Sequence, residues 1–453
     1  MSNLLRACIC ALIFLPLTSC KSFAQEPVES PRNVVFMVGD GMGFAHVKAY
    51  RMYADDPSTD LVEPLPFDAL QVGSVSTDSI IMNCDALKLN CKRDPHGFTD
   101  SASSATAYAT GRDTVSGRLS VDPSGKPMRT ILEDARMHGK STGLVSTSQI
   151  THATPAAFAS HVISRRLQND IADQFFDGQW QEKPMVNVML GGGLDYLRRD
   201  DRDLVSEFQN SGYQVALNRT ELLGMEGDRL LGLFAPSGMP RAWDRDSETP
   251  SLAEMTGAAL NALAQNQKGF FLMVEGSEVD WASHGNSVVG VISEMEDFIA
   301  AVRVVLDFAR QHPDTLVVIT ADHETGGMAV GRDGIYRWDA KPLQGMKGTP
   351  DAMTGRYLAG EELLSAIVAD NIAFKLNTAE VAELDATERV EDAAYSAITD
   401  LFNLRTNTGW SSGGHTGVDV PLYAFGLGKE HFHGVMQNED VGRVMHQVFL
   451  PGK

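Results

Sequence analysis

One stretch of the sequence, residues 270–284, combines carboxylates and an imidazole in an order suited to binding metal ions. Its apolar start, residues 270–274, predicts a buried strand, and Glu275 follows directly. If a helix begins after the strand, Asp280 and His284 lie one turn apart on the same face. A carboxylate and an imidazole so placed suit Zn²⁺, whereas Glu275 at the strand tip suits a harder ion such as Mg²⁺. Taken alone, the segment fits a charged surface loop equally well.

Other apolar runs also end in residues that can bind a cation. Residues 33–38 lead to Asp40, residues 316–320 to Asp322 and His323, and residues 141–147 to His152 and Thr154. Ligands of open α/β sheets bind beyond the carboxyl ends of the strands. We therefore expect a convergence at one sheet edge of Asp40, Glu275, Asp280, Asp322 and His323. Their carboxylates would repel one another unless cations lie between them.

Positioning these side chains requires a sheet whose strands alternate with helices. Further strands are expected over residues 187–190 and 421–426. Apolar residues at helical spacing predict a helix over residues 288–309. This alternation predicts an α/β fold, a three-layer sandwich in which helices flank a central, mostly parallel sheet.

The candidate ligands extend through almost the whole chain, from Asp40 to His415. A site assembled from such distant segments implies one domain, which we place over residues 31–453. Two stretches interrupt the pattern and are expected to be peripheral insertions. Residues 200–250 are polar and irregular, and residues 331–410 begin as a loop rich in Gly and Pro and continue with a helical pattern.

A serine lies where a helix is expected to begin. The alanine-rich run at residues 98–111 favours a helix, and Asp100 is in the position of its N-cap. Ser101 would then lie in the first turn, where free backbone N–H groups and the helix dipole favour an anion. A structural helix with an ordinary cap is the alternative. Because no Gly-x-Ser-x-Gly motif surrounds Ser101, activation of its hydroxyl by a metal fits better than a Ser-His-Asp arrangement.

The composition restricts the classes of partner. The chain has 453 residues, 43% of them hydrophobic, and a formal net charge of -21. This length is ample for a large core, and the acidic balance argues against binding to nucleic acid or to an anionic membrane surface. A site that binds phosphate would need local metal charge to overcome the overall field.

The N-terminus reads as a targeting segment, residues 1–24, rather than as part of the fold. Arg6 gives a positive flank, and the apolar core at residues 9–17 is too short to span a membrane. The sequence Leu-Thr-Ser-Cys that ends at Cys20 resembles the cleavage box of bacterial lipoproteins, which predicts a lipidated N-terminal Cys20. Ordinary cleavage after Ala24 is the alternative. Both predict export, and the first predicts a membrane-anchored periplasmic lipoprotein.

The cysteines outside this segment are Cys84 and Cys91. An exported protein permits a disulfide, and two cysteines separated by a short loop are the obvious pair. A metal site is less favoured, because no histidine or third cysteine accompanies them closely.

Seven segments together carry a resemblance to a known family. They are VGDGMG at 38, TDSASSATA at 99, HATP at 152, SHVISR at 160, VEGSEVDWASH at 274, TADHETGG at 320 and GGHTG at 413. In this order they resemble the metal-dependent alkaline phosphatases and span nearly the whole chain after the targeting segment. The resemblance implies broad-specificity hydrolysis of small phosphate monoesters through a phosphoserine intermediate, and a homodimer.

The resemblance also implies a role for individual residues. Ser101 would be the nucleophile, and Arg165 would bind the phosphate, with Arg166 the weaker candidate. One Zn²⁺ would be held by Asp280, His284 and His415, and a second Zn²⁺ by Asp40, Asp322 and His323. A third ion, usually Mg²⁺, would be held by Asp40, Thr154 and Glu275. Arg165 can pair with two phosphate oxygens at once, which lysine cannot do.

The chain departs from one common family pattern at two positions that bear on the third ion. His152 stands where many members carry aspartate, and Trp281 where many carry lysine. Because an imidazole lacks the charge of a carboxylate, we expect this secondary site to be weaker for Mg²⁺ and to accept Zn²⁺ or Co²⁺.

Two other classes of function stay open at this point. One is a related phosphodiesterase or sulfatase, although the Cys/Ser-x-Pro-x-Arg context of sulfatases is absent around Ser101. Diesterases tend to lack an equivalent of Arg165, because a diester offers fewer anionic oxygens. The other is a non-enzymatic envelope protein that captures metal or phosphate.

Overall fold

A twisted ten-stranded sheet forms the centre of the protein. The computed structural model describes residues 30–79, 81–82, 93–94, 97–360 and 362–450. In sheet order the strands are β18 (Gly434–Gln437), β2 (Gln71–Ser76), β17 (Val420–Gly426), β12 (Thr315–Thr320), β1 (Asn33–Gly39), β11 (Phe270–Gly276), β5 (Ser141–Gln149), β8 (Val188–Gly192), β10 (Leu230–Leu233) and β9 (Gln214–Ala216). The predicted strands therefore lie in this one sheet.

The sheet is mostly parallel, as the sequence predicts. From β12 to β9 every neighbouring pair is parallel, whereas β17 runs antiparallel to both β12 and β2. All residues of β1, β11 and β12 are buried. Strands covered on both faces need continuous apolar runs, which is why these segments lack an alternating pattern.

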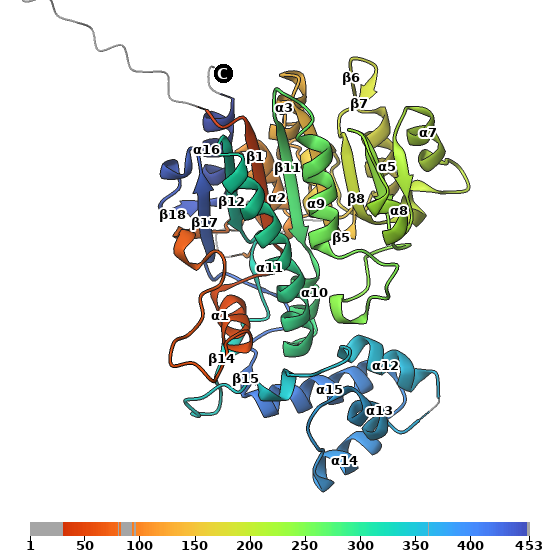
Figure 1. Cartoon of the computed structure of the whole chain (residues 1–453), viewed down its shortest axis with the longest axis vertical. Helices are drawn as coiled ribbons and strands as arrows, with labels where there is room; N and C mark the ends of the chain where they lie inside the picture. Colours follow the sequence, from red (N-terminus) through yellow and green to blue (C-terminus); the bar gives the residue numbers. More distant parts are fainter. Residues whose placement is uncertain (1–29, 80, 83–92, 95–96, 361, 451–453) are drawn as a thin grey trace, which may run out of the picture.

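Helices cover both faces of the sheet and complete the three-layer sandwich. Figure 1 shows α9 (Leu252–Leu263) and α11 (Val288–Gln311) in front of the sheet, with α2 (Ser101–Thr110) and α3 (Ile131–Met137) behind it. Other helices of this body are α1 (Phe44–Tyr53), α4 (Ala153–Ala159), α5 (Gln168–Asp177), α6 (Leu194–Leu197), α10 (Glu278–His284) and α16 (Asn438–Phe449).

The segment near residues 200–250 corrects one expectation. We expected it to be irregular, but it contains α7 (Leu204–Asn210) and α8 (Arg219–Leu223) and supplies the strands β9 and β10. These strands are only three and four residues long and end the sheet. Strands this short leave little periodicity to read in the sequence.

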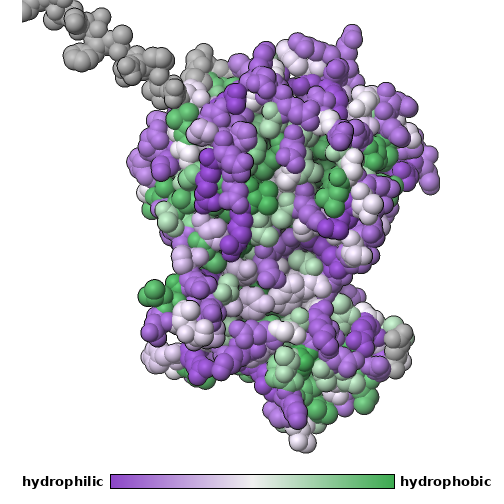
Figure 2. All heavy atoms as spheres, viewed as in Figure 1, coloured by the Kyte–Doolittle hydropathy of each residue, from purple (hydrophilic) through white to green (hydrophobic). Residues whose placement is uncertain are grey.

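The segment near residues 331–410 stands apart from the sheet. It starts as a loop and continues through α12 (Pro350–Leu358), α13 (Leu364–Asn371), α14 (Thr378–Asp385) and α15 (Glu391–Thr406). Figure 1 shows these helices grouped below the main body, on the side where α1 and α10 lie. Figure 2 shows mostly hydrophilic residues over the face of the main body.

Eight short strands of the described residues lie outside the central sheet. They are β3 (Ile81–Met82), β4 (Arg93–Asp94), β6 (Gln179–Trp180), β7 (Lys183–Pro184), β13 (Glu324–Thr325), β14 (Ala329–Val330), β15 (Thr408–Gly409) and β16 (His415–Thr416). Within the described ranges no helix combines the length and apolarity needed to cross a bilayer. The predicted targeting segment, with Cys20, and the predicted pair Cys84 and Cys91 lie outside the described residues, so these stay predictions.

Candidate active site

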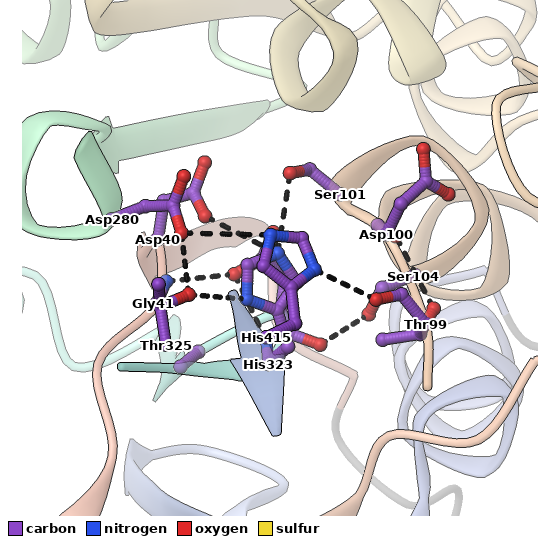
Figure 3. A network of polar contacts seen from close by, with 12 residues as sticks. Asp40, Gly41, Thr99, Asp100, Ser101, Ser104, Asp280, His323, Thr325 and His415 are labelled. Carbon is purple, nitrogen blue, oxygen red and sulfur yellow. Dashed lines mark hydrogen bonds and ion pairs between the residues drawn. The ribbon is translucent and has the colours of Figure 1, made fainter. Parts of the chain in front are cut away.

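The carboxyl ends of three neighbouring strands bring the candidate residues together. Asp40 follows β1, Glu275 lies near the end of β11, and Asp322 and His323 follow β12. The start of α10 carries Asp280 close to them. Figure 3 shows the side chains of Asp40, Asp280, His323 and His415 pointing toward one another, with Ser101 beside them. Residues separated by more than 300 positions thus share one pocket because parallel strands end at the same edge.

Close packing at this edge depends on Gly41. Its φ is +73°, and a Cβ atom there would lie 2.8 Å from the Cα of Asp280. Its backbone N–H donates to Asp322 Oδ1 at 3.1 Å. Only glycine allows both this conformation and this approach, so the glycine beside Asp40 brings α10 against the loop after β1.

Asp280, His284 and His415 form the first candidate metal group. One ligand atom of each lies within 4.8 Å of the others. His284 Nε2 is 3.3 Å from Asp280 Oδ2, and His415 Nε2 is 3.7 Å from Asp280 Oδ1. Burial opposes ionisation of Asp280, but the surrounding histidines outweigh burial and hold its pKa below the usual value. The same carboxylate raises the pKa of His284 to about 9.

Three histidines are held so that one ring nitrogen faces the pocket. The Nδ1 atoms of His284 and His415 each lie 2.8 Å from a backbone carbonyl, of Gly413 and Thr99 respectively. His323 Nδ1 lies 3.2 Å from the Thr325 hydroxyl, which itself donates to Asp280. Carbonyl groups can only accept, so Nδ1 carries the proton of each neutral ring and Nε2 is the nitrogen that can bind a cation; in His284 a cation would first displace the proton that Asp280 favours. This arrangement is typical of histidines that bind metal.

Asp40, Asp322 and His323 form a second, fully buried group. His323 Nε2 lies 3.2 Å from Asp322 Oδ2 and 3.6 Å from Asp40 Oδ1. The ligand atoms that lie within 4.8 Å of one another here come from Asp40, Asp280 and His323, and Asp322 is outside that set. Both oxygens of Asp40 and one of Asp322 have no hydrogen-bond partner. Buried carboxylate oxygens without partners are costly, and cations would satisfy them.

The pKa values in this group express the same cost. Burial is the main cause that raises the pKa of Asp40 well above its usual value, and the carboxylates of Asp322, Asp280 and Glu275 add to it. Burial and Asp280 raise the pKa of Asp322 to about 6. Burial and His415 push the pKa of His323 well down. Without cations the pocket therefore resists holding all its carboxylates ionised.

The third group contains Asp40, Glu275 and His152. Their ligand atoms lie within 4.8 Å of one another, which makes His152 a closer candidate than its secondary place in the sequence analysis suggested. Glu275 Oε1 and His152 Nδ1 are buried without partners. Burial raises the pKa of Glu275, and the nearby hydroxyl of Thr154 lowers that pKa only in part. The ring of Trp281 packs edge-on against His152, with centroids 5.6 Å apart.

Ser101 lies at the first position of α2, as its sequence context predicted. Asp100 is the N-cap and accepts a hydrogen bond from the backbone N–H of Ser103. Ser101 is only 2% exposed, and its Oγ lies 3.3 Å from His323 Nε2. The hydroxyl is thus at the positive end of a helix and beside the second candidate metal group.

Arg165 contacts Asp100, the residue before Ser101, whereas Arg166 is exposed to solvent. Arg165 Nη1 donates to Asp100 Oδ2 at 3.1 Å, and Nη2 donates to His152 Nε2 at 2.8 Å. Asp100 also accepts from the backbone N–H of Gly117, through both oxygens at 3.0 Å. From the sequence we expected Asp100 only to cap the helix. Its contact with Arg165 spans 65 positions and leaves no local signal in the sequence.

The chain is similar in sequence and in structure to known proteins. The sequence model of the family described as "Alkaline phosphatase" matches residues 31–450. Alkaline phosphatase 3 of Bacillus subtilis is 42% identical over 95% of this chain and 91% of its own length. Alkaline phosphatase 4 of the same organism is 39% identical over 100% of this chain and 96% of its own. The crystal structure of a cold-active alkaline phosphatase from a psychrophilic Shewanella covers 92% of this chain and 99% of its own, with a TM-score of 0.82 and 36% identity.

Proposed function

Because this chain belongs to the alkaline phosphatase family and is a phosphatase, we propose that it hydrolyses phosphate monoesters through a phosphoserine at Ser101. The observation that carries this proposal is the position of Ser101 Oγ. It lies at the N-terminus of α2, 3.3 Å from His323 Nε2, at the border of the buried carboxylates that lack partners.

The donor sets fit divalent cations, which the family implies. Asp280, His284 and His415 would hold one Zn²⁺, and Asp40, Asp322 and His323 a second Zn²⁺, because imidazole and carboxylate together suit this ion. When bound, these ions would supply positive charge that favours the ionised serine and binds the phosphate dianion despite the acidic surface. The partnerless oxygens of Asp40 and Asp322 support this assignment.

The residues of the chain perform the displacement in two steps. The ionised Ser101 Oγ forms a bond to phosphorus while the bond to the leaving alcohol breaks. A water molecule then displaces the serine oxygen and releases inorganic phosphate. The free N–H groups at the start of α2 and the guanidinium of Arg165 hold the phosphate oxygens in both steps.

For the third group we propose a site that binds Mg²⁺ weakly. Arg165 donates to His152 Nε2, so the neutral ring carries its proton on Nδ1. Burial is the first cause that lowers the pKa of His152, to about 3, so the ring is neutral. While His152 Nε2 accepts the hydrogen bond from Arg165, Nδ1 carries the ring proton and cannot bind a cation. Binding through Nδ1 would require that proton to leave Nδ1. Asp40, Glu275 and Thr154 would then hold Mg²⁺ with one carboxylate fewer than an aspartate at 152 would provide.

The deciding experiment traps the covalent intermediate. Metal-loaded protein is mixed with a labelled phosphate monoester, quenched in acid, and the label is mapped by peptide sequencing. We expect label on Ser101, its absence in Ser101→Ala, and its loss on chelation with recovery on adding Zn²⁺. Label on another residue, or full turnover by Ser101→Ala, would refute the proposal.

A second assay separates monoesters from diesters. Arg165 supports a monoester, because its two N–H groups suit a group with several anionic oxygens. We expect the rate of hydrolysis of an aryl phosphate monoester to exceed that of the matching diester. Arg165→Ala should reduce the ratio of the monoester rate to the diester rate. A higher rate on the diester would favour the related phosphodiesterase. Export as a lipoprotein and dimerisation remain proposals, checked by lipid labelling of Cys20 and by mass in solution.

A further inference from the structure

A polar hollow lies at the end of the sheet opposite the active site. Its volume is about 440 Å³, and its wall includes Ser141 at the start of β5, Asn187 just before β8, and Trp180 and Lys183 of the β6–β7 hairpin. Figure 1 shows this hairpin at the far end of the sheet from α10. Ligand cavities commonly measure roughly 300–1,000 Å³, so the hollow has room for a small molecule.

Two guanidinium groups in the wall have almost no partners. Arg229 is 9% exposed, and within the described residues its side chain makes no hydrogen bond or ion pair. Its Nη1 is buried without a partner, and its guanidinium lies over the Tyr213 ring at 5.3 Å. Arg136, from α3, has a partnerless buried Nε and donates through Nη1 to Asn187 Oδ1 at a long 3.4 Å.

These groups are anomalous in so acidic a chain. The sequence has 59 acidic residues against 38 lysines and arginines, which makes carboxylate partners plentiful. Asp228 also lines the hollow, but no ion pair joins it to Arg136 or Arg229 in the described part of the chain. Burial first, and then the charge of Arg229, lowers the pKa of Arg136, while the nearby Tyr213 and Asp228 act in the opposite direction. Buried guanidinium nitrogens without hydrogen-bond partners are costly, so this arrangement suits an anionic ligand that places a counter-charge beside the two guanidinium groups.

We propose that this hollow is a second anion site, separate from the active site, for a phosphate group that is either free or carried by a small organic molecule. Arg136 and Arg229 would donate to its oxygens, since guanidinium groups match the geometry of phosphate. Lys183 at the exposed rim adds a third positive charge, and the half-buried Trp180 offers a face for an organic part.

Counting bound phosphate tests the proposal. Radiolabelled inorganic phosphate is measured by equilibrium dialysis on metal-loaded full-length protein and on the double variant Arg136→Gln, Arg229→Gln. We expect the wild type to bind one more phosphate per chain than the variant, whatever number the active site binds. Arg303→Gln, which removes an exposed arginine from α11, should bind as the wild type does. Equal stoichiometry in wild type and double variant would overturn the proposal.

Activity and stability measurements keep the test independent of the catalytic site. The double variant should hydrolyse an aryl phosphate at the wild-type rate, because neither arginine lies near Ser101. It should unfold at the same or a higher temperature in anion-free buffer, since it loses two buried positive charges that form no ion pair in the described residues. If it fails to fold, Lys183→Gln at the rim serves instead, with an expected loss of roughly threefold in phosphate affinity. Unchanged affinity in Lys183→Gln would then overturn the proposal.

Two probes distinguish the sources of the phosphate group. The two probes are inorganic phosphate and phenylphosphonate, which cannot be hydrolysed. For each probe, the rise in unfolding temperature on adding it is measured in the wild type and in the double variant, and the difference between the two rises reports binding at the hollow. An organic ligand is indicated if phenylphosphonate binds roughly tenfold tighter and Trp180→Ala removes the difference. Free phosphate is indicated if both bind equally. No rise with either probe would contradict the proposal.

Discussion

Asp100 is expected to hold Arg165 in place for phosphate binding as well as to cap α2. Two substitutions separate these roles. Asp100→Asn keeps a good capping side chain but removes the charge, whereas Asp100→Ala removes both. In the structure Asp100 accepts hydrogen bonds from Ser103, Gly117 and Arg165 at 2.8–3.1 Å. The ion pair with Arg165 is about three-quarters buried, with exposed fractions of 26% and 22% for the two side chains.

The expected magnitudes follow from these contacts. Asp100→Ala should lose about 1 kcal/mol for the cap and about 1–2 kcal/mol for the stranded backbone N–H of Gly117. Asp100→Asn should lose about 1 kcal/mol, because a charged acceptor becomes neutral. Either variant frees Arg165, so phosphate should bind about tenfold more weakly, which corresponds to about 1.4 kcal/mol. KM and the inhibition constant for phosphate should rise together, and saturated turnover should change less.

The pH dependence gives an independent check. Burial raises the pKa of Asp100, but Arg165 and the backbone N–H groups outweigh burial, so its net pKa is lowered. Its unfolded value is about 3.9, so its contribution is fully present above that pH and is lost as pH falls through the lower folded value. The stability difference between wild type and Asp100→Asn should therefore be constant from pH 6 to 8 and shrink in acid.

Asp203 provides a matched control. It caps α7 with the same hydrogen bond, from Ser206 N at 3.1 Å, but lies far from the active site. Asp203→Asn should leave KM and phosphate inhibition unchanged. Chemical denaturation and steady-state kinetics measure both effects. If Asp100→Asn leaves KM and phosphate inhibition at wild-type values, Asp100 does not position Arg165 and the reasoning fails.

Three further predictions concern the ions and the phosphate. Metal-free protein should lose stability as pH rises from about 4 through 6, because Asp322 has a raised folded pKa of about 6 and its stabilising proton is lost there; thermal unfolding across pH measures this, and restored Zn²⁺ should abolish the trend. His152→Asp should bind Mg²⁺ roughly tenfold tighter in calorimetry, because a carboxylate replaces a neutral ring; unchanged affinity would argue against a third site there. Arg165→Lys should lose roughly tenfold in kcat/KM while Arg166→Lys keeps wild-type kinetics, because Arg166 is exposed; equal losses would mean that Arg165 is not the phosphate-binding residue.

The sequence alone determined the elements that carry the site. Continuous apolar runs predicted β1, β11 and β12 to within a few residues, and the polar residues at their ends predicted a shared edge. The alanine-rich run with Asp100 before it predicted the start of α2. These features are local, because burial on both faces and helix capping each act over a few neighbouring positions.

Only the tertiary structure decided how the groups meet across the chain. Several contacts join residues far apart in sequence. They are the contact of Asp100 with Arg165, the facing nitrogens of His284, His323 and His415, and the grouping of His152 with Asp40. The strands β9 and β10, and the guanidinium nitrogens of Arg136 and Arg229 that lack hydrogen-bond partners, could not be predicted from the sequence either. Whether a charged or polar group finds a partner depends on packing in three dimensions, and residue type and spacing along the chain do not encode that directly.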